Sequence, residues 1–134
     1  GRIVYSSQSD VRSAREVHLF KIDPHGTFPE RLPIPKGSDA DVSPDARAIA
    51  YTQMPPQPQW KTYRGGSVSR IAIMSFADHA LQKVPQPPQR CNDINPMWIG
   101  GKVYFKLVGF ASCGVGGADL AARLLHVLHQ HTTL

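Results

Sequence analysis

The chain has no apolar run approaching the roughly 20 residues that a membrane-spanning helix needs, so no membrane span is expected. Its first residues also lack the basic, apolar and small-residue order of a signal peptide. The cytoplasm is therefore favoured as the compartment. The periplasm stays open, because the chain begins at Gly1 without an initiator methionine and reads as a fragment whose N-terminal segment is missing.

Cysteine is scarce, with two in 134 residues. Cys91 and Cys113 match no zinc-ligand spacing and do not build a disulfide framework, so free thiols are expected. Positive charge is not concentrated either, because the lysines and arginines behind the formal net charge of +5 are spread almost evenly. Phosphate binding needs such residues to cluster, so nucleic acid is not expected as a partner.

Histidines gather near the C-terminal end as His126, His129 and His131. Imidazoles three positions apart on a helix can share a metal ion, but no Asp, Glu or Cys close to them completes a ligand set. We therefore expect no metal site, and no motif in the chain points to a cofactor.

The first hundred or so residues do not keep helical periodicity for three turns anywhere. Short apolar runs instead alternate with turns rich in Pro, Gly, Asn and Asp, which predicts an all-β fold. The candidate strands are Ile3 to Ser6, Val17 to Ile22, Glu30 to Ile34, Ala48 to Thr52, Arg70 to Phe76, Leu81 to Val84 and Lys102 to Lys106.

These strands repeat as a set. Tyr5, Tyr51 and Phe105 end three similar strands, spaced 46 and 54 residues apart. A spacing of roughly 40 to 50 residues is typical of one β-propeller blade. The pattern therefore predicts about two blades and the first strand of a third.

Three motifs lie within and between the repeats. The segment from Ser43-Pro44-Asp45-Ala46 to Tyr51 resembles the Ser-Pro-Asp-Gly hairpin of TolB-like propeller blades, and Asn95-Pro96-Met97-Trp98 to Phe105 is a shortened version of it. Trp60-Lys61-Thr62-Tyr63-Arg64-Gly65-Gly66 lies between them, and Arg90-Cys91-Asn92-Asp93 precedes the second. Together the motifs resemble the first propeller of tricorn-type serine peptidases, over roughly residues 1 to 105.

The resemblance implies a partial β-propeller domain over residues 1–105. Because a closed propeller needs at least four blades, the remainder of the ring is expected to come from the parent protein. An open array exposes sheet edges and blade faces, so the chain alone is expected to be marginally stable and prone to aggregate.

Six residues of the two hairpin motifs are expected to be structural rather than catalytic: Ser43, Pro44, Asp45, Asn95, Pro96 and Trp98. In such a turn the proline fixes φ and the aspartate side chain bonds nearby backbone amides. Ala46 stands where the family pattern has glycine. That position usually needs a positive φ, so we expect a strained or differently shaped turn.

The insertion between Tyr51 and Arg70 holds the candidate peptide-contacting residues Trp60, Lys61, Tyr63 and Arg64. In one interpretation they line a channel or contact a peptide, with Arg64 suited to a carboxylate. In the other, which the frequent use of aromatic plugs in blade loops favours, the two rings cap the core of the blade. Both interpretations stay open at this point.

The family resemblance implies a non-catalytic propeller fragment that acts as a scaffold or gate for a distant serine peptidase site. No residue here matches the catalytic residues of the family, and Ser112 lacks the glycine that a nucleophile elbow requires two positions earlier. The expected partners are the rest of the propeller, the peptidase half, and peptides, in a homo-oligomeric parent. The alternative is a TolB-like module that binds a protein partner.

The repeat pattern is lost after Phe105, and we treat residues 106–134 as a separate, aberrant tail. A short helix near residues 118–130 would align Leu120, Leu124 and Leu128 on one side. The other explanation, which the abrupt change of composition favours, is a slip of the reading frame near Phe105.

Overall fold

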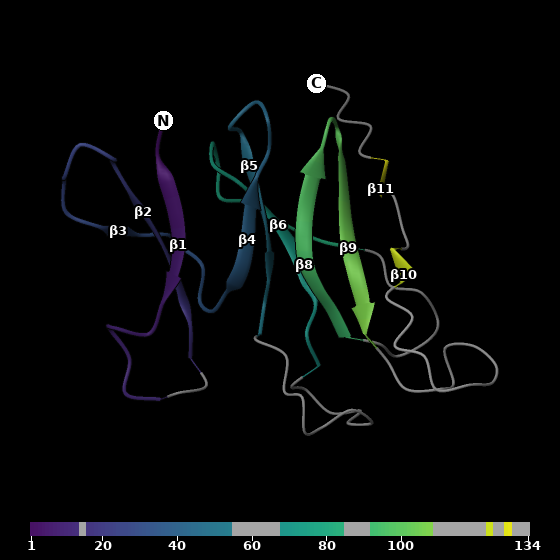
Figure 1. Cartoon of the computed structure of the whole chain (residues 1–134), viewed down its shortest axis with the longest axis horizontal. Coiled ribbons are helices and arrows are strands. Elements are labelled where there is room, and N and C mark those ends of the chain that lie inside the picture. The colour runs from purple at the N-terminus through teal and green to yellow at the C-terminus, as the bar shows by residue number, and fades with distance from the viewer. Residues whose placement is uncertain (14–15, 55–67, 85–91, 109–122, 125–127, 130–134) are drawn as a thin grey trace.

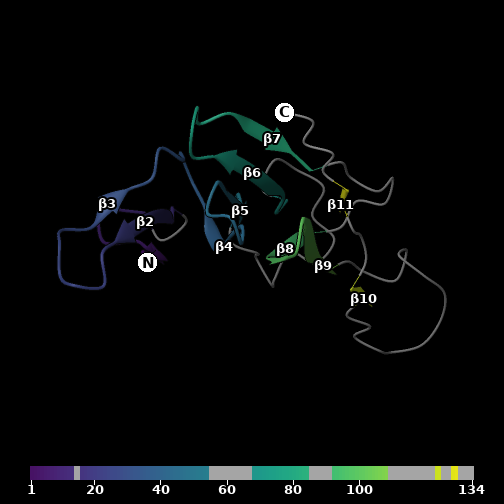
Figure 2. The same ribbon diagram turned by 90° about the horizontal axis from the view of Figure 1, so that it is seen from above.

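The computed structural model describes residues 1–13, 16–54, 68–84, 92–108, 123–124 and 128–129 (Figure 1). Every regular element among these residues is a β-strand, and the strands form three sheets with antiparallel pairing. The sheets follow one another along the chain, as Figure 2 shows from above. The predicted all-β class is therefore confirmed.

The first sheet contains β1 (Ile3–Ser7), β2 (His18–Ile22) and β3 (Glu30–Arg31), in that order. Ile3 pairs with Ile22 and Tyr5 pairs with Phe20, so these apolar side chains share one face. The rings of Tyr5 and Phe20 stack on this face with their centroids 5.7 Å apart.

The second sheet contains β4 (Ser38–Val42), β5 (Ala48–Thr52), β6 (Ile71–Ser75) and β7 (Leu81–Lys83), also in chain order. Four of the five residues of β5 are buried. Ile49 and Tyr51 pack toward the first sheet, and Ala50 packs toward the third. The period of two along a strand explains how one short strand supplies two apolar faces.

The third sheet is built on the hairpin of β8 (Asn92–Ile99) and β9 (Lys102–Val108). On the other edge, β9 pairs with β10 (Arg123–Leu124) and β11 (Leu128–His129), which are two residues long each. The helix offered for residues 118–130 is therefore wrong at these four residues, which pair as strands with β9. The rest of that range lies outside the described residues.

Two apolar layers hold the sheets together. The layer between the first and second sheets consists of Leu19, Leu32, Ile34, Ile49, Tyr51, Ala72 and Met74. The layer between the second and third sheets consists of Ala50, Ile71, Ile73, Val84, Val103 and Phe105. The second sheet is thus covered on both faces, and burial of this apolar surface is the main stabilising term of the array.

The register of the second and third sheets repeats in detail. β4 has an irregularity between Ser38 and Asp41, and β8 has one between Ile94 and Met97. Within these bulges Asp39 has a φ of 43° and Asn95 a φ of 51°. Both are residue types that tolerate a positive φ. The two sheets are therefore copies of one unit, down to the residue that bends the first strand.

All seven predicted strands are present. Ala48–Thr52 has the predicted bounds, and each of the other six differs by one to three residues at one or both ends. β4 and β8 were not predicted. Their sequences, Ser-Asp-Ala-Asp-Val and Asn-Asp-Ile-Asn-Pro-Met-Trp-Ile, are polar and interrupted, and neither alternates cleanly. Pro96 lies at the bulge of β8, where its missing N–H removes no regular ladder bond.

Candidate functional site

The residues predicted to contact peptides, Trp60, Lys61, Tyr63 and Arg64, lie in the stretch 55–67, outside the described residues. The structure does place the two ends of this insertion. The N–H of Gln53 donates to the carbonyl of Arg70 at 2.7 Å. The hydroxyl of Ser69 donates to the carbonyl of Met54 at 2.8 Å. The insertion therefore leaves and re-enters the second sheet at one closed point.

This point also joins the second sheet to the third. Asn92 Oδ1 accepts a hydrogen bond from the N–H of Ser69 at 2.9 Å, and the N–H of Asp93 donates to the carbonyl of Ser69 at 3.1 Å. Ser69 is fully buried. We call Ser69, Arg70, Asn92 and Asp93 the insertion base. Its hydrogen bonds fix the origin of the loop that carries the predicted peptide contacts.

Asp93 is the titratable group of the insertion base. Its side chain is 3 % exposed, and Oδ2 lies 4.0 Å from Nη1 of Arg70. Burial raises the pKa of Asp93 to about 6, and the charge of Arg70 offsets only part of that effect. The carboxyl group therefore changes charge around pH 6, at the junction of two sheets.

The hairpin between β4 and β5 contains the predicted turn residues Ser43, Pro44 and Asp45. The hydroxyl of Ser43 donates to Asp45 Oδ1 at 2.6 Å and accepts from the N–H of Ala48 at 3.0 Å. Asp45 Oδ1 also accepts from the N–H of Arg47 at 3.1 Å. The hydrogen bonds from Ser43 and Arg47 lower the pKa of Asp45. These contacts are internal to the turn, and none aims a group at a ligand.

Ala46 completes this turn with a φ of 57°. The left-handed region is unfavourable for a residue with a Cβ. In the corresponding turn of the third sheet, Gly100 has a φ of 60°. The strain expected at Ala46 therefore takes the form of this positive φ.

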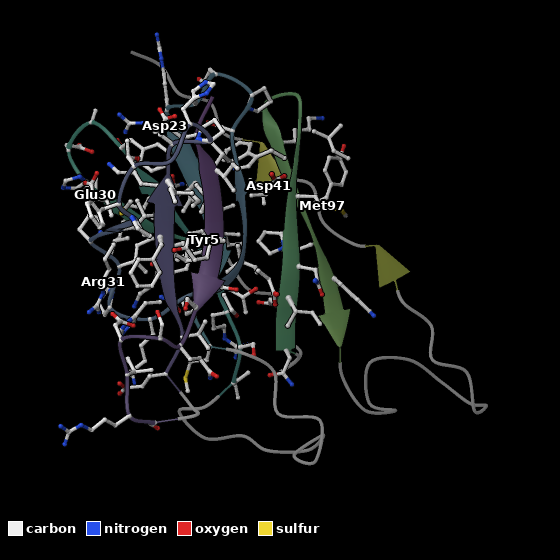
Figure 3. All side chains as sticks on the ribbon, turned by 60° about the vertical axis from the view of Figure 1, so that its left-hand side comes forward. Tyr5, Asp23, Glu30, Arg31, Asp41 and Met97 are labelled. Carbon is white, nitrogen blue, oxygen red and sulfur yellow. The ribbon has the colours of Figure 1, made fainter. Side chains whose placement is uncertain are left out.

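The second hairpin motif contributes to the sheet junction. Asn95 supplies the positive φ of the β8 bulge, and Pro96 is buried next to it. Asp41 of β4 accepts a hydrogen bond from the backbone N–H of Trp98 at 2.7 Å, and Figure 3 shows Asp41 beside β8. The side chain of Trp98 packs against the layer between the second and third sheets.

A polar cluster on the first sheet was missed by the sequence analysis. His18 Nδ1 lies 2.9 Å from both carboxylate oxygens of Asp10, and His18 Nε2 lies 2.9 Å from Nη2 of Arg31. Partial burial opposes ionisation of Asp10, but the hydrogen bond with His18 and the charge of Arg31 outweigh it and lower its pKa. The three residues are far apart in sequence, so no spacing signal could have revealed them.

This cluster does not form a general base with a nucleophile. The guanidinium of Arg31 donates to His18 Nε2, so the ring donates through Nδ1 to Asp10. Both ring nitrogens are therefore engaged, so among the described residues the histidine has no free nitrogen with which to serve a nucleophile. The cluster ties β2 and β3 to the loop after β1.

In the part of the chain that the structure describes, no group of three or more His, Cys, Asp and Glu side chains is arranged to hold a metal ion. Within the same residues, no helix is long and apolar enough to cross a membrane. Cys91 and Cys113 lie outside these ranges.

Successive antiparallel sheets of up to four strands, packed face to face in chain order, are the blades of a β-propeller. The described part of the chain is accordingly a propeller segment. Residues 1–106 match the family of tricorn protease N-terminal beta propeller domains, and the chain belongs to this family. No curated protein matches the sequence.

Proposed function

We propose that this chain is a non-catalytic propeller segment of a tricorn-like peptidase, a scaffold or gate that guides peptides toward a serine peptidase site in another part of the parent protein. Membership of the tricorn N-terminal propeller family supports this function. So do the polar contacts of the described residues, which join strands, turns and sheets to one another.

The insertion base is the observation that carries the gating role. Two hydrogen bonds close the ends of the 55–67 insertion, at 2.7 and 2.8 Å, and two more tie the same point to the third sheet. A loop held in this way starts from a rigid platform, which is how folds commonly present binding residues. Trp60, Lys61, Tyr63 and Arg64 belong to this loop in the sequence.

The chemistry of these four side chains suits a peptide. Arg64 can hold a carboxylate through two parallel N–H donors, and Lys61 adds a second positive charge. Trp60 and Tyr63 offer flat apolar surfaces with a polar edge, which pack well against peptide side chains and backbone. We therefore assign recognition of a peptide C-terminus or acidic side chain to this loop.

The test measures the fluorescence anisotropy of a labelled octapeptide, with a free or an amidated C-terminus, against the full chain. The free carboxylate should bind several-fold more tightly, and Arg64→Ala should abolish the difference. Arg47→Ala is the matched control, because Arg47 is an exposed arginine in a turn, 74 % exposed at its side chain. Loss of stability without loss of binding in Arg64→Ala would favour the capping role instead.

A peptidase assay with the same preparation tests the non-catalytic part of the proposal. The pure chain should not cleave fluorogenic peptides above the buffer rate. Cleavage that disappears in Ser112→Ala would overturn the proposal. The alternative, a TolB-like module that binds a protein partner, shares the blade architecture but has no separate observation in its favour.

For the tail we propose a slip of the reading frame. The family match ends at residue 106, close to the point where the repeat pattern is lost. Residues 106–108 of the tail continue β9, and its other described residues form two strands of two residues each. Translation of the encoding DNA in the other two frames after Phe105 should resume a Ser-Asp-Arg-x-Gly turn and further blades. A tail that is native to the gene would leave no such continuation.

A further inference from the structure

Three buried side-chain atoms in the described part of the chain have no hydrogen-bond partner: Ser38 Oγ, Thr52 Oγ1 and Trp98 Nε1. Trp98 lies near the end of β8, but the other two lie together. Ser38 and Thr52 are 6 % and 0 % exposed and are directly opposite each other in the register of β4 and β5. We call them the hydroxyl pair. Because a buried hydroxyl group without a partner is unfavourable, this pair requires a further group to bond.

The hydroxyl pair faces the third sheet. Thr52 also pairs with Ile71 of β6, which belongs to the apolar layer between the second and third sheets. Residues directly opposite each other on antiparallel strands share a face, so Ser38, Thr52 and Ile71 form one row on that side. The bulge at Asp39 turns Ser38 to this side, whereas Val42 of the same strand packs toward the first sheet.

Asp93 faces the hydroxyl pair from the third sheet. It pairs with Leu107 of β9, two positions after Phe105, which belongs to the same apolar layer. The side chain of Asp93 therefore points toward the second sheet. The N–H of Asp93 donates to the carbonyl of Ser69 at 3.1 Å, and Ser69 lies two positions before Ile71. Asp93 thus meets the second sheet next to the row that contains the hydroxyl pair.

The strand directions place these groups at the same end of the junction. β4 and β8 contact each other and run in the same direction (Figure 1). Ser38 is the first residue of β4, and Asp93 is the second residue of β8. Both have shorter side chains than the isoleucine and phenylalanine residues of the surrounding layer, and so fill less of the space between the sheets.

We propose that a water molecule is bound between the second and third sheets by Ser38 Oγ, Thr52 Oγ1 and the carboxyl group of Asp93. The water accepts hydrogen bonds from the two hydroxyl groups and donates one to the carboxylate. Buried waters typically make about three such bonds to groups that are otherwise unsatisfied. A cation suits this place less well, because the guanidinium of Arg70 already lies 4.0 Å from Asp93 Oδ2. The water site is independent of the peptide role of the insertion.

A water also suits the change of charge at Asp93. Burial raises the pKa of this carboxyl group to about 6. A water donates to the ionised carboxylate and accepts from the protonated form, whereas a cation bonds only the ionised form. The water should therefore stay bound on both sides of this pKa.

The test counts the long-lived internal waters of the full chain by ¹⁷O relaxation dispersion of the solvent, above and below the pKa of Asp93. Thr52→Val and Ser38→Ala should each lower the dispersion amplitude by the contribution of one water. The double variant should show no further fall, because both hydroxyl groups hold the same molecule. Thr27→Val is the matched control: Thr27 is exposed between β2 and β3, so the full amplitude should remain.

The urea unfolding transition of each variant shows whether it folds. Thr52→Ser keeps a hydroxyl group at this position and should keep the water, which separates loss of the water from loss of packing. If Thr52→Val fails to fold, Ser38→Ala and Thr52→Ser still decide the matter, since the first should lose one water and the second none.

An unchanged amplitude in both single variants would overturn the proposal, because the hydroxyl groups would then hold no water. Falls that add in the double variant would also overturn it, since the two groups would bind separate molecules. A sodium ion in this place, detected as ²³Na relaxation that Asp93→Asn abolishes, would replace the water by a cation and is the third outcome that contradicts the proposal.

Discussion

Asp41 Oδ2 accepts a hydrogen bond from the backbone N–H of Trp98 at 2.7 Å, across 57 positions of sequence and between two sheets. The register of the repeat puts Met97 at the position in β8 that Asp41 occupies in β4. The carboxylate is therefore specific to the junction of the second and third sheets. A charged acceptor in a partly buried position makes a stronger hydrogen bond than a neutral one.

Asp41→Ala should lower the free energy of unfolding by about 1.5–3 kcal/mol, because the N–H of Trp98 loses a charged acceptor. Urea unfolding followed by tryptophan fluorescence measures the change. Glu30→Ala is the control: it removes a carboxylate that is 67 % exposed and paired with Lys21. It should change stability by less than about 1 kcal/mol. Equal effects of the two variants would contradict the role of Asp41 at the junction.

Ala46→Gly should stabilise the chain by about 1 kcal/mol, because glycine adopts a positive φ without the steric penalty of a Cβ. The backbone at Ala46 has a φ of 57°. Ala48→Gly, two residues later inside β5, should destabilise by at least about 0.5–1 kcal/mol, since there glycine adds unfolded-state entropy and removes a methyl group that packs on the layer between the second and third sheets. The measurement is the midpoint of thermal unfolding of each variant. Shifts of the same sign in the two variants would contradict the strain assigned to Ala46.

Gly37→Ala should destabilise the junction of the first and second sheets. A Cβ at this position would lie 2.9 Å from Tyr51 Cδ2 and 3.0 Å from Leu19 Cδ1, both in the buried layer. Overpacking of this kind typically costs about 1–3 kcal/mol. Gly101→Ala is the matched control, because a Cβ there meets nothing within 4 Å. The midpoints of urea unfolding should fall for the first variant and hold for the second.

Asp93 should make stability depend on pH in the direction opposite to an ordinary ion-paired carboxylate. Its pKa is raised from 3.8 to about 6 in the folded chain, so the folded state binds the proton more tightly than the unfolded state. The free energy of unfolding should therefore decrease as the pH rises from about 4 to about 6, by no more than about 3 kcal/mol. Above that range the contribution is constant.

Asp93→Asn should remove this pH dependence and unfold at higher urea than the unmodified chain at pH 7. Asp45 should contribute a pH dependence of stability of the opposite sign, which Asp45→Asn should remove. The pKa of Asp45 is lowered by its hydrogen bonds with Ser43 and Arg47, so its stabilising contribution is lost as the pH falls through the folded pKa. A difference between the Asp93→Asn variant and the unmodified chain that does not change between pH 4 and pH 7 would refute the assignment.

The seven strands that alternate apolar and polar residues could be predicted from sequence, because that alternation is a local property. β4 and β8 could not. Their residues alternate poorly, and a bulge at Asp39 and at Asn95 shifts the side-chain direction within each strand. Their pairing with β5 and β9, rather than their own pattern, makes them strands.

The candidate site could likewise be predicted only where its contacts are local in sequence. Asp45 accepts hydrogen bonds from the hydroxyl of Ser43 and from the N–H of Arg47, each over two positions, so the turn could be recognised from spacing. The insertion base joins Ser69 to Asn92 across 23 positions, and the polar cluster joins Asp10, His18 and Arg31 from separate segments. Such contacts depend on how sheets are placed, which no local pattern specifies.

The sequence by itself determined the all-β class, the repeat and the family, because strand periodicity and turn chemistry are encoded within a few residues. Only the tertiary structure decided which copy of each repeated residue is buried. Tyr5, Tyr51 and Phe105 occupy equivalent positions in similar strands, yet the first is 36 % exposed and the other two are 1 % exposed. The difference arises because burial of a sheet face requires a neighbouring sheet, and the described chain supplies one for Tyr51 and Phe105 but not for Tyr5.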